Sequence, residues 1–315
     1  MRVEWVVLDT LNTELILCGV DGTGRVTGSS LGPFALWHFG IMDALRGVSQ
    51  LQSASVFGPY TVSTEGRDGF PPERQLSVSE AFEWLGKATG AALDHGNRTP
   101  VICLGDHTFS AASVAAGVAR IPGLQVLWID AHADLNTPAT SPSGNLHGMP
   151  AAMLTHLTIP TAESFAQYRD LLPRDCLAPT SLHYWGVRDL DTAEREILRG
   201  HPGFVATMSD IDRFSTSTLA EKLLERIAPG GPLWISFDID SVDPLSAPGT
   251  GTPVPEGLTK REALTLAEIL AGHAAEGRVR IAGVEVVELN PLRDKGRSCD
   301  FAVTWVASIL GKSIL

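Results

Sequence analysis

Six short apolar segments, separated by longer stretches with helical patterning, constrain the fold of this chain more than any other feature. They lie at about 4–9, 100–104, 124–129, 182–187, 232–237 and 280–287. Several are apolar on both faces, which is typical of parallel strands covered by helices. Strands that alternate with helices build a doubly wound sheet. The sequence therefore predicts an α/β fold of three layers, α-β-α, around a doubly wound and mostly parallel sheet.

The chain has 315 residues, which is enough for one large α/β domain or two ordinary ones. Capping-box spacing at Ser77, Thr218 and Thr259, each with Glu three residues later, marks helix starts. Segments rich in Gly, Pro, Ser and Thr are expected to be loops: 20–33, 57–75, 136–150 and 241–258. No internal repeat or low-complexity linker interrupts the pattern. We therefore expect a single domain over residues 1–315.

Charge and cysteine usage exclude several classes of function. A formal net charge of −12, without a cluster of Lys and Arg, argues against a nucleic-acid partner. No run of about 18 apolar residues and no basic leader segment is present, so neither membrane insertion nor secretion is expected. The four cysteines are scattered and include no Cys-x-x-Cys pair. This usage indicates a reducing compartment, and we expect a cytoplasmic protein.

Side chains that bind metals follow the predicted strands one after another. These residues are His107, then Asp130, His132 and Asp134, then Asp238 and Asp240, and finally Glu288. Any one alone is more often a cap, a turn residue or a surface charge. In open α/β sheets, however, ligands bind beyond the carboxyl ends of the strands. So many carboxylates with a minority of imidazoles and no cysteine favour Mn²⁺ over Zn²⁺.

The same segments resemble the ureohydrolase family, which contains arginases, agmatinases and related hydrolases of guanidino groups. The similarity extends from about residue 95 to the C-terminus, and in the first 90 or so residues only Gly32-Pro33-Phe34 suggests it. Asn136-Thr137-Pro138, followed by Ser143-Gly144-Asn145-Leu146-His147-Gly148-Met149-Pro150, is similar to the arginase branch in particular. The resemblance implies an arginase-like fold around a pair of Mn²⁺ ions.

The resemblance also implies a role for each matching residue. His107, Asp130, Asp134 and Asp238 would hold one ion, and Asp130, His132, Asp238 and Asp240 the other. The reaction would be hydrolysis of L-arginine to L-ornithine and urea by a hydroxide that bridges the ions, oriented by Asp134. His147, expected in a flexible loop with a pKa near neutrality, would shuttle protons, and Glu288 would pair with the guanidinium. Asn136, Ser143 and Asn145 would bind the substrate carboxylate, Asp191 with support from Glu194 would face its ammonium group, and Thr252 would line the same pocket.

Some positions depart from the family pattern. Leu104 stands where the family usually has a second glycine, and Thr108 where it has a serine, which could alter the first metal ligand. Residues 10–75 do not follow the arginase pattern closely, and loops there normally shape the pocket entrance. The family forms trimers or hexamers, but the chain stops soon after Ile309, so a monomer is an open alternative to a homo-oligomer.

Two other functions stay open. The substrate could instead be a small guanidino amino acid other than arginine that belongs to a biosynthetic pathway. Nω-hydroxy-L-arginine, for example, would use the same contacts, and its hydrolysis would release hydroxyurea. Agmatine and guanidinobutyrate are less favoured because each lacks one charged group, and an unpaired buried polar group costs roughly 1–3 kcal/mol. A non-catalytic homologue that binds amino acids is the alternative from another class, but such a protein is expected to have lost metal ligands.

Overall fold

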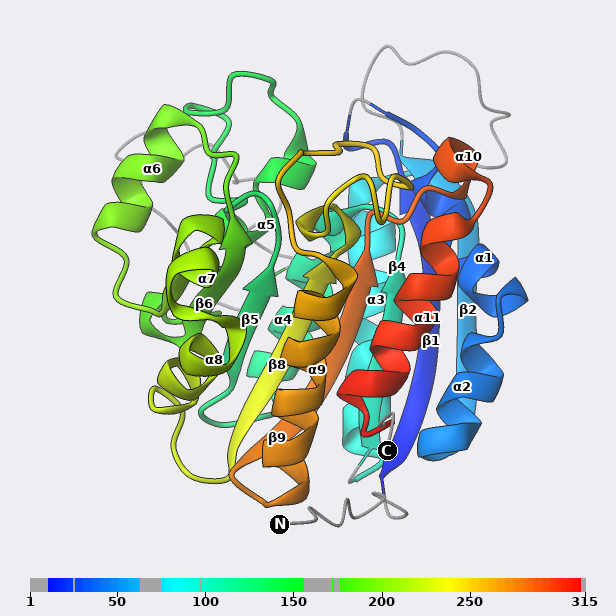
Figure 1. Cartoon of the computed structure of the whole chain (residues 1–315). Coiled ribbons are helices and arrows are strands. Elements are labelled where there is room, and N and C mark those ends of the chain that lie inside the picture. The colour runs from blue at the N-terminus through cyan, green and yellow to red at the C-terminus, as the bar shows by residue number, and fades with distance from the viewer. Residues whose placement is uncertain are drawn as a thin grey trace.

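A nine-stranded sheet with helices on both faces organises the chain (Figure 1). The computed structural model describes residues 11–24, 26–62, 75–96, 98–155, 172 and 176–312. All strand pairs in this part of the chain are parallel, which confirms the predicted α/β class with its doubly wound sheet. The strand predicted at 4–9 lies outside the described residues.

The strands follow the order β3-β2-β1-β4-β9-β8-β5-β6-β7 across the sheet. Their bounds are β1 (Asn12–Asp21), β2 (Gln50–Val62), β3 (Gln75–Leu76), β4 (Arg98–Leu104), β5 (Gln125–Ile129), β6 (Leu182–Val187), β7 (Val205–Thr207), β8 (Gly231–Asp238) and β9 (Val279–Val287). Five predicted strands therefore match β4, β5, β6, β8 and β9 to within two residues. The loop predicted at 57–75 was wrong as far as Val62, because β2 mixes polar and apolar residues, is half-exposed and contains Gly58 and Pro59, which are typical of loops.

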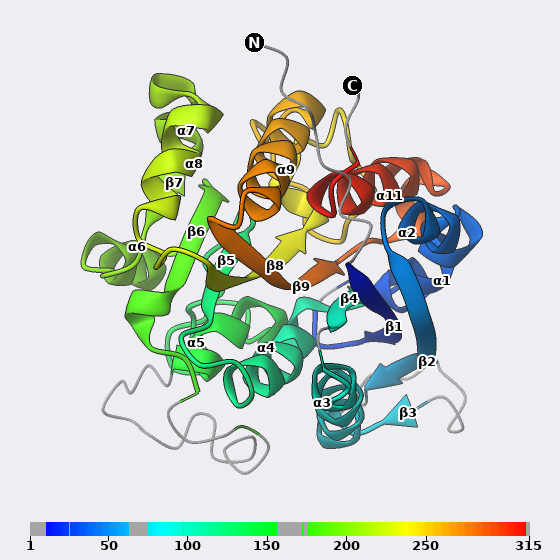
Figure 2. The same cartoon turned by 90° about the horizontal axis from the view of Figure 1, so that it is seen from below.

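Helices cover the two faces of the sheet unequally (Figure 2). One face carries α1 (Gly32–His38), α2 (Ile41–Val48), α7 (Met208–Phe214), α8 (Thr216–Leu224), α9 (Lys260–Ala275) and α11 (Arg297–Ile309). The other carries α3 (Val78–Asp94), α4 (Ser110–Val118) and α5 (Pro150–Thr155). Two further helices, α6 (Thr192–Arg199) and α10 (Pro291–Asp294), follow β6 and β9. A separate apolar core lies on each face, as expected for three layers.

The predicted helix starts agree with the structure at two of three positions. Ser77 and Thr259 form capping boxes at α3 and α9. The predicted start of α8 at Thr218 was wrong, because the helix begins earlier in the chain. Its N-cap is Ser215, whose hydroxyl accepts from Thr218 N at 3.4 Å. Several hydroxyl residues in succession can each cap a helix, so spacing alone did not identify the first turn.

Five neighbouring strands, β4, β9, β8, β5 and β6, position the candidate site. Because they run parallel, their carboxyl ends meet at the same edge of the sheet, the upper edge in Figure 1. The ends of β4, β5 and β8 and the segments that follow them hold the predicted metal ligands, and the segments after β6 and β9 hold Asp191 and Glu288. Within the described part of the chain, no helix combines the length and apolar character needed to cross a membrane.

Candidate metal centre and substrate cavity

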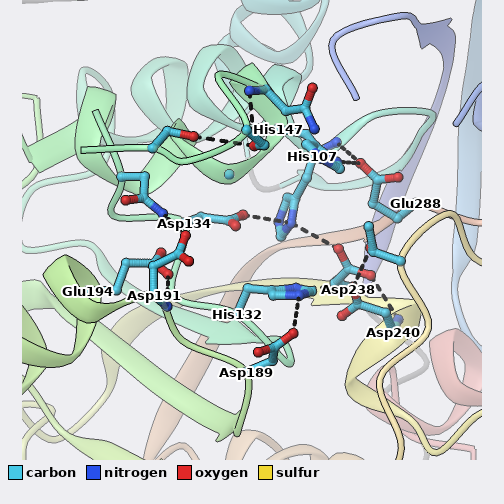
Figure 3. Close-up of a pocket in the computed structure, with 16 residues that line it drawn as sticks. His107, His132, Asp134, His147, Asp189, Asp191, Glu194, Asp238, Asp240 and Glu288 are labelled. Carbon is cyan, nitrogen blue, oxygen red and sulfur yellow. Dashed lines mark hydrogen bonds and ion pairs between the residues drawn. The ribbon is translucent and has the colours of Figure 1, made fainter. Parts of the chain in front are cut away.

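A cavity of about 260 Å³ opens at the carboxyl edge of the sheet (Figure 3). Its described walls contain carboxylates, imidazoles, amides and hydroxyls, but neither Lys nor Arg. The lining residues are His107, His132, Asp134, Asn136, Ser141, Ser143, Asn145, His147, Gly148, Asp189, Asp191, Glu194, Asp238, Asp240, Thr252 and Glu288. Every site residue predicted from the sequence is among them except Asp130, which is 1% exposed and contacts both candidate metal groups.

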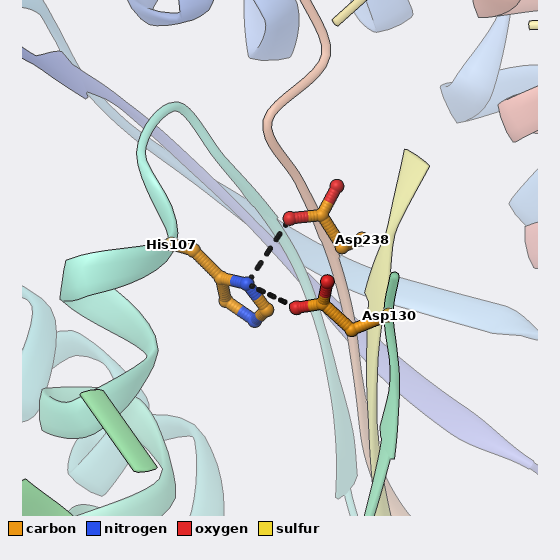
Figure 4. A group of neighbouring side chains, drawn as sticks. All are labelled: His107, Asp130 and Asp238. Carbon is orange, nitrogen blue, oxygen red and sulfur yellow. Dashed lines mark ion pairs between the residues drawn. The ribbon is translucent and has the colours of Figure 1, made fainter. Parts of the chain in front are cut away.

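The first candidate metal group surrounds the His107 imidazole (Figure 4). His107 Nδ1 lies 3.2 Å from Asp130 Oδ2, 3.2 Å from Asp134 Oδ2 and 3.1 Å from Asp238 Oδ2. Both His107 Nδ1 and Asp134 Oδ2 are buried without a hydrogen bond of ordinary geometry. Atoms that share one ion at about 2.1 Å along perpendicular directions lie about 3 Å apart. The atoms of His107, Asp130 and Asp238 lie within 4.8 Å of one another and therefore fit a metal ion, with Asp134 Oδ2 as a further carboxylate beside His107.

The second group forms around His132. Its Nδ1 lies 3.3 Å from Asp130 Oδ1 and 3.2 Å from Asp240 Oδ2. Asp130 thus offers one carboxylate oxygen to each group, as expected of a residue shared by two ions. His132 Nε2 is 3.8 Å from Asp189, a carboxylate that can orient the ring from outside.

The charges in this space support the same interpretation. Burial and the neighbouring Asp130 carboxylate raise the pKa of Asp134, and burial with the charges of Asp240 and Asp130 raises the pKa of Asp238. Burial opposes protonation of His107, but the surrounding carboxylates outweigh it and raise its pKa well above the ordinary range. Without cations, therefore, Asp134 and Asp238 resist ionisation, whereas His107 and His132 lower the pKa of Asp130 and keep it ionised. Two divalent ions would remove that conflict.

Two of the predicted site residues have unusual backbone conformations. Asp134 has φ of 54° and Glu288 has φ of 60°, in the left-handed region that non-glycine residues rarely adopt. Both side chains are buried. Such strain concentrates at functional sites, where the surrounding structure holds it in place.

His147 and Glu288 form an ion pair at the cavity wall. His147 Nδ1 lies 3.4 Å from Glu288 Oε1, and the same oxygen accepts from His107 N at 2.9 Å. Burial disfavours the charged imidazole, but Glu288 more than compensates and raises the pKa of His147 to about 9. The expectation of a pKa near neutrality was therefore wrong, because this histidine is mostly buried beside a carboxylate.

At the rim of the cavity, Asn136, Asp191 and Glu194 form a connected group. Asn136 Nδ2 donates to Asp191 Oδ2 at 2.8 Å, and Asp191 is the N-cap of α6. Glu194 accepts from Asp191 N at 3.1 Å and from Leu135 N at 3.1 Å, which ties α6 to the segment after β5. Glu194 is 3% exposed, so it supports the rim while Asp191 faces the cavity.

The remaining predicted binding residues, Ser143, Asn145 and Thr252, differ in the hydrogen bonds that they form. Ser143 Oγ accepts from Asn145 N at 3.2 Å and lies 3.3 Å from Ser141 Oγ, in an open turn beside the cavity. Thr252 donates to Asp240 Oδ2 at 2.9 Å. Thr252 therefore lines the predicted pocket while its hydroxyl holds a candidate metal ligand.

Sequence reasoning missed a cluster around Asp106. Asp106 Oδ2 accepts from Thr23 N and Gly24 N, each at 3.2 Å, and Asp106 Oδ1 accepts from the Thr23 hydroxyl. Thr108 Oγ1 is 2.6 Å from Thr23 Oγ1, so the threonine that departs from the family pattern forms part of this cluster. Thr23 O accepts from Leu146 N, next to His147. The N-terminal segment therefore joins the His107 and His147 loops, and no local signal marks a bond across 83 residues.

Arg188 was also missed. Its guanidinium donates to the carbonyl oxygens of Asp240 at 2.8 Å, Val254 at 2.6 Å and Pro255 at 3.0 Å. One side chain thus holds the Asp240 segment against the loop that follows it. The signal available in the sequence was its place directly after β6, where a charged residue beside a buried strand suggests a defined partner.

Comparisons with known proteins identify relatives over nearly the whole chain. The family model described as the arginase family matches residues 13–311. An arginase from Staphylococcus aureus (strain MRSA252) is 32% identical over 309 residues, covering 95% of this chain and 97% of that protein. The structure of arginase from Bacillus subtilis superposes with a TM-score of 0.80 at 28% identity, covering 96% of this chain and all of the other. Proclavaminate amidino hydrolase from Streptomyces clavuligerus shares the fold, with a TM-score of 0.70 at 23% identity over 96% of this chain and 92% of its own.

Proposed function

This chain belongs to the arginase family of hydrolases, and we propose that it cleaves the guanidino group of L-arginine to give L-ornithine and urea in a centre that holds two Mn²⁺ ions. The observation that carries the proposal is a cavity with negatively charged and neutral polar walls, in which candidate metal groups lie close to Glu288 and Asp191. Because arginine has two cationic groups and one carboxylate, both its charge and its polarity match such walls.

The proposed metal ligands are the six residues at the strand ends. His107 and Asp134 would hold one ion, and His132 and Asp240 the other, with Asp130 and Asp238 between them. The oxygen-rich donor set suits Mn²⁺, and the four cysteines are buried elsewhere. Two such ions, when bound, would lower the pKa of a shared water toward neutrality and so supply a nucleophile strong enough for a guanidinium carbon.

The chain's own residues would then place the substrate and move the protons. Asp134 would offer Oδ2, which lies 3.2 Å from His107 Nδ1, to the ion, and its second carboxylate oxygen would accept a hydrogen bond from the attacking water and orient it. Glu288 would hold the guanidinium. Attack forms a C–O bond, and the bond between the guanidino carbon and the ornithine nitrogen breaks. His147 is protonated at neutral pH because its pKa is raised to about 9, so it could donate a proton to that nitrogen.

Residues at the rim of the cavity would bind the α-ammonium and α-carboxylate groups of the substrate. Asp191 would bind the substrate ammonium group, with Glu194 supporting its loop. Neutral donors, Asn136, Ser143 and Asn145, would bind the carboxylate, while Thr252 would keep Asp240 in place.

We include in the proposal a single domain over residues 1–315, supported by one sheet that contains strands from both ends of the chain. A cytoplasmic location is supported by the free cysteines.

The test is a steady-state assay of the manganese-loaded protein on matched concentrations of L-arginine, Nω-hydroxy-L-arginine and agmatine. We expect the highest kcat/KM for L-arginine, with L-ornithine as product. A strong preference for the hydroxylated substrate would replace arginine in the proposal, and no turnover of any of the three would overturn it. Glu288→Gln is the matched control, because it keeps an acceptor for His107 N but removes the charge that would bind the guanidinium.

A further inference from the structure

Glu285 is a carboxyl group in the centre of the sheet. It lies on β9 between β4 and β8, opposite Ile102 on one side and Ser236 on the other. Its exposure is 0%. No Lys or Arg within the described residues forms an ion pair with it, although a buried charge without a partner is costly. The proposed reaction leaves this group without a role.

Hydroxyl groups surround the Glu285 carboxyl. The Ser113 hydroxyl, on α4, donates to Glu285 Oε1. The hydroxyls of Ser110 and Ser236 are close enough to lower the pKa of the carboxyl, but burial is the larger effect and raises it overall. Glu285 Oε2 and Ser110 Oγ nevertheless lack a hydrogen bond of ordinary geometry. Glu285 therefore retains acceptor capacity on the side of these hydroxyls.

Ser236 connects this carboxyl to the candidate metal centre. Its Oγ lies 3.0 Å from His107 Nε2, on the far side of the ring from the three carboxylates. If Nδ1 is to offer a lone pair to an ion, the proton of the neutral ring must be on Nε2. Nε2 then donates to Ser236, and the Ser236 hydroxyl proton is free to point toward Glu285. The result is a path from carboxyl to hydroxyl to imidazole.

We propose that Glu285 is a positioning residue for the metal centre, which acts through Ser236 to hold His107 in the orientation and tautomer that bind an ion. Metal-binding histidines commonly donate their second N–H to such a partner, and the partner strengthens the ligand. Here a serine lies between the carboxyl and the ring. This inference rests on the proposed function, because it requires the metal ions.

A positioning role for Glu285 predicts a different result on mutation than a purely structural role does. Replacing this carboxyl with an amide of similar volume removes a charge that burial disfavours and keeps an oxygen that can accept from the Ser113 hydroxyl. Glu285→Gln should therefore leave the melting temperature of the metal-free protein unchanged or higher while weakening metal binding. A purely structural residue would lower the stability of the metal-free protein.

The experiment compares Glu285→Gln, Ser236→Ala and the double variant, with the exposed Glu225→Gln as control. Titration calorimetry with Mn²⁺ measures affinity, and thermal unfolding of the metal-free proteins measures stability. We expect each single variant to bind Mn²⁺ about 10- to 100-fold more weakly. The double variant should bind Mn²⁺ no more weakly than the single variant with the lower affinity, because both substitutions interrupt the same hydrogen-bonded path from Glu285 to His107.

Unchanged affinity in both single variants, or losses that add in the double variant, would overturn the inference. A fall in metal-free stability that accompanies the loss of affinity in Glu285→Gln would also refute it. Ser236→Ala provides the independent route if Glu285→Gln does not fold, because it interrupts the same path with a smaller change. Failure of the proposed function is distinct: the wild-type protein itself would then bind no Mn²⁺.

Discussion

Asp191 offers the most discriminating test of substrate recognition. Its carboxylate accepts from Asn136 and caps α6, so Asp191→Ala would damage the loop as well as the binding site. Asp191→Asn is the better change, because Asn is as good an N-cap as Asp and retains an oxygen for Asn136. With that oxygen turned toward Asn136, the new amide NH₂ faces the cavity and repels an ammonium group.

The size of the effect follows from the contact that is lost. A hydrogen bond to a charged group contributes about 1.5–3 kcal/mol. Asp191 is half-buried, so solvent screening places it in the lower part of that range. At about 1.4 kcal/mol for each tenfold change, kcat/KM for L-arginine should fall about 10- to 30-fold.

The assay compares L-arginine with 5-guanidinopentanoate, which is arginine without its ammonium group. Asp191→Asn should reduce kcat/KM for arginine and leave the value for the deaminated analogue nearly unchanged. Asp189→Asn is the matched control, since it removes the same charge two residues away, beside His132. That control should affect both substrates equally. Equal losses on the two substrates in Asp191→Asn would refute the assignment of the ammonium contact.

Three further predictions address the metal, the proton donor and stability. Asp238→Asn should lose most of its bound manganese together with activity, because Asp238 Oδ2 is 3.1 Å from His107 Nδ1; full occupancy by elemental analysis would contradict this. Gly24→Ala would place a methyl group 3.0 Å from the His147 ring, and we expect kcat to fall about 10-fold or more with manganese content intact. In a His147→Asn background the same change should cost nothing further, and a second equal loss would argue against a path through His147. His183 is buried and its pKa is lowered to about 4, so between pH 6.5 and 4 the unfolded chain takes up a proton that the folded chain does not. Stability should therefore be fully present above pH 6.5 and fall by about 3 kcal/mol toward pH 4; His183→Asn should flatten that slope in denaturant titrations, whereas the exposed His38→Asn should not.

The metal-ligand candidates could be found from the sequence because two simple regularities coincide. Parallel strands that are buried on both faces read as apolar runs, and the residue after each run lies at one shared edge. Asp130 and Asp238 follow such runs directly, so their proximity was predictable before the strand order was known. The half-exposed strand β2 lacks the apolar run, and it was missed for that reason.

Other features depend on contacts between distant segments. Glu285 lies between Val284 and Val286, and an alternating pattern of this kind is also typical of a strand with one solvated face. Only its register with Ser236 on β8 and Ile102 on β4 places it in the interior. The positive φ of Glu288 carries no sequence signal, because glycine does not occupy the position.

The distribution of charge joins the metal centre to substrate choice. Four buried carboxylates, Asp130, Asp134, Asp238 and Asp240, carry together the charge that two divalent cations would neutralise. Four other carboxylates line the cavity. Asp189 lies beside His132 and Glu194 accepts from the backbone of Asp191 and Leu135, so the proposed function leaves Glu288 near the metal groups and Asp191 at the rim to contact a substrate. A guanidino amino acid presents one cationic group to each of them. Its carboxylate must then be bound by neutral donors, since no Lys or Arg lines the described cavity, and Ser143 and Asn145 are such donors.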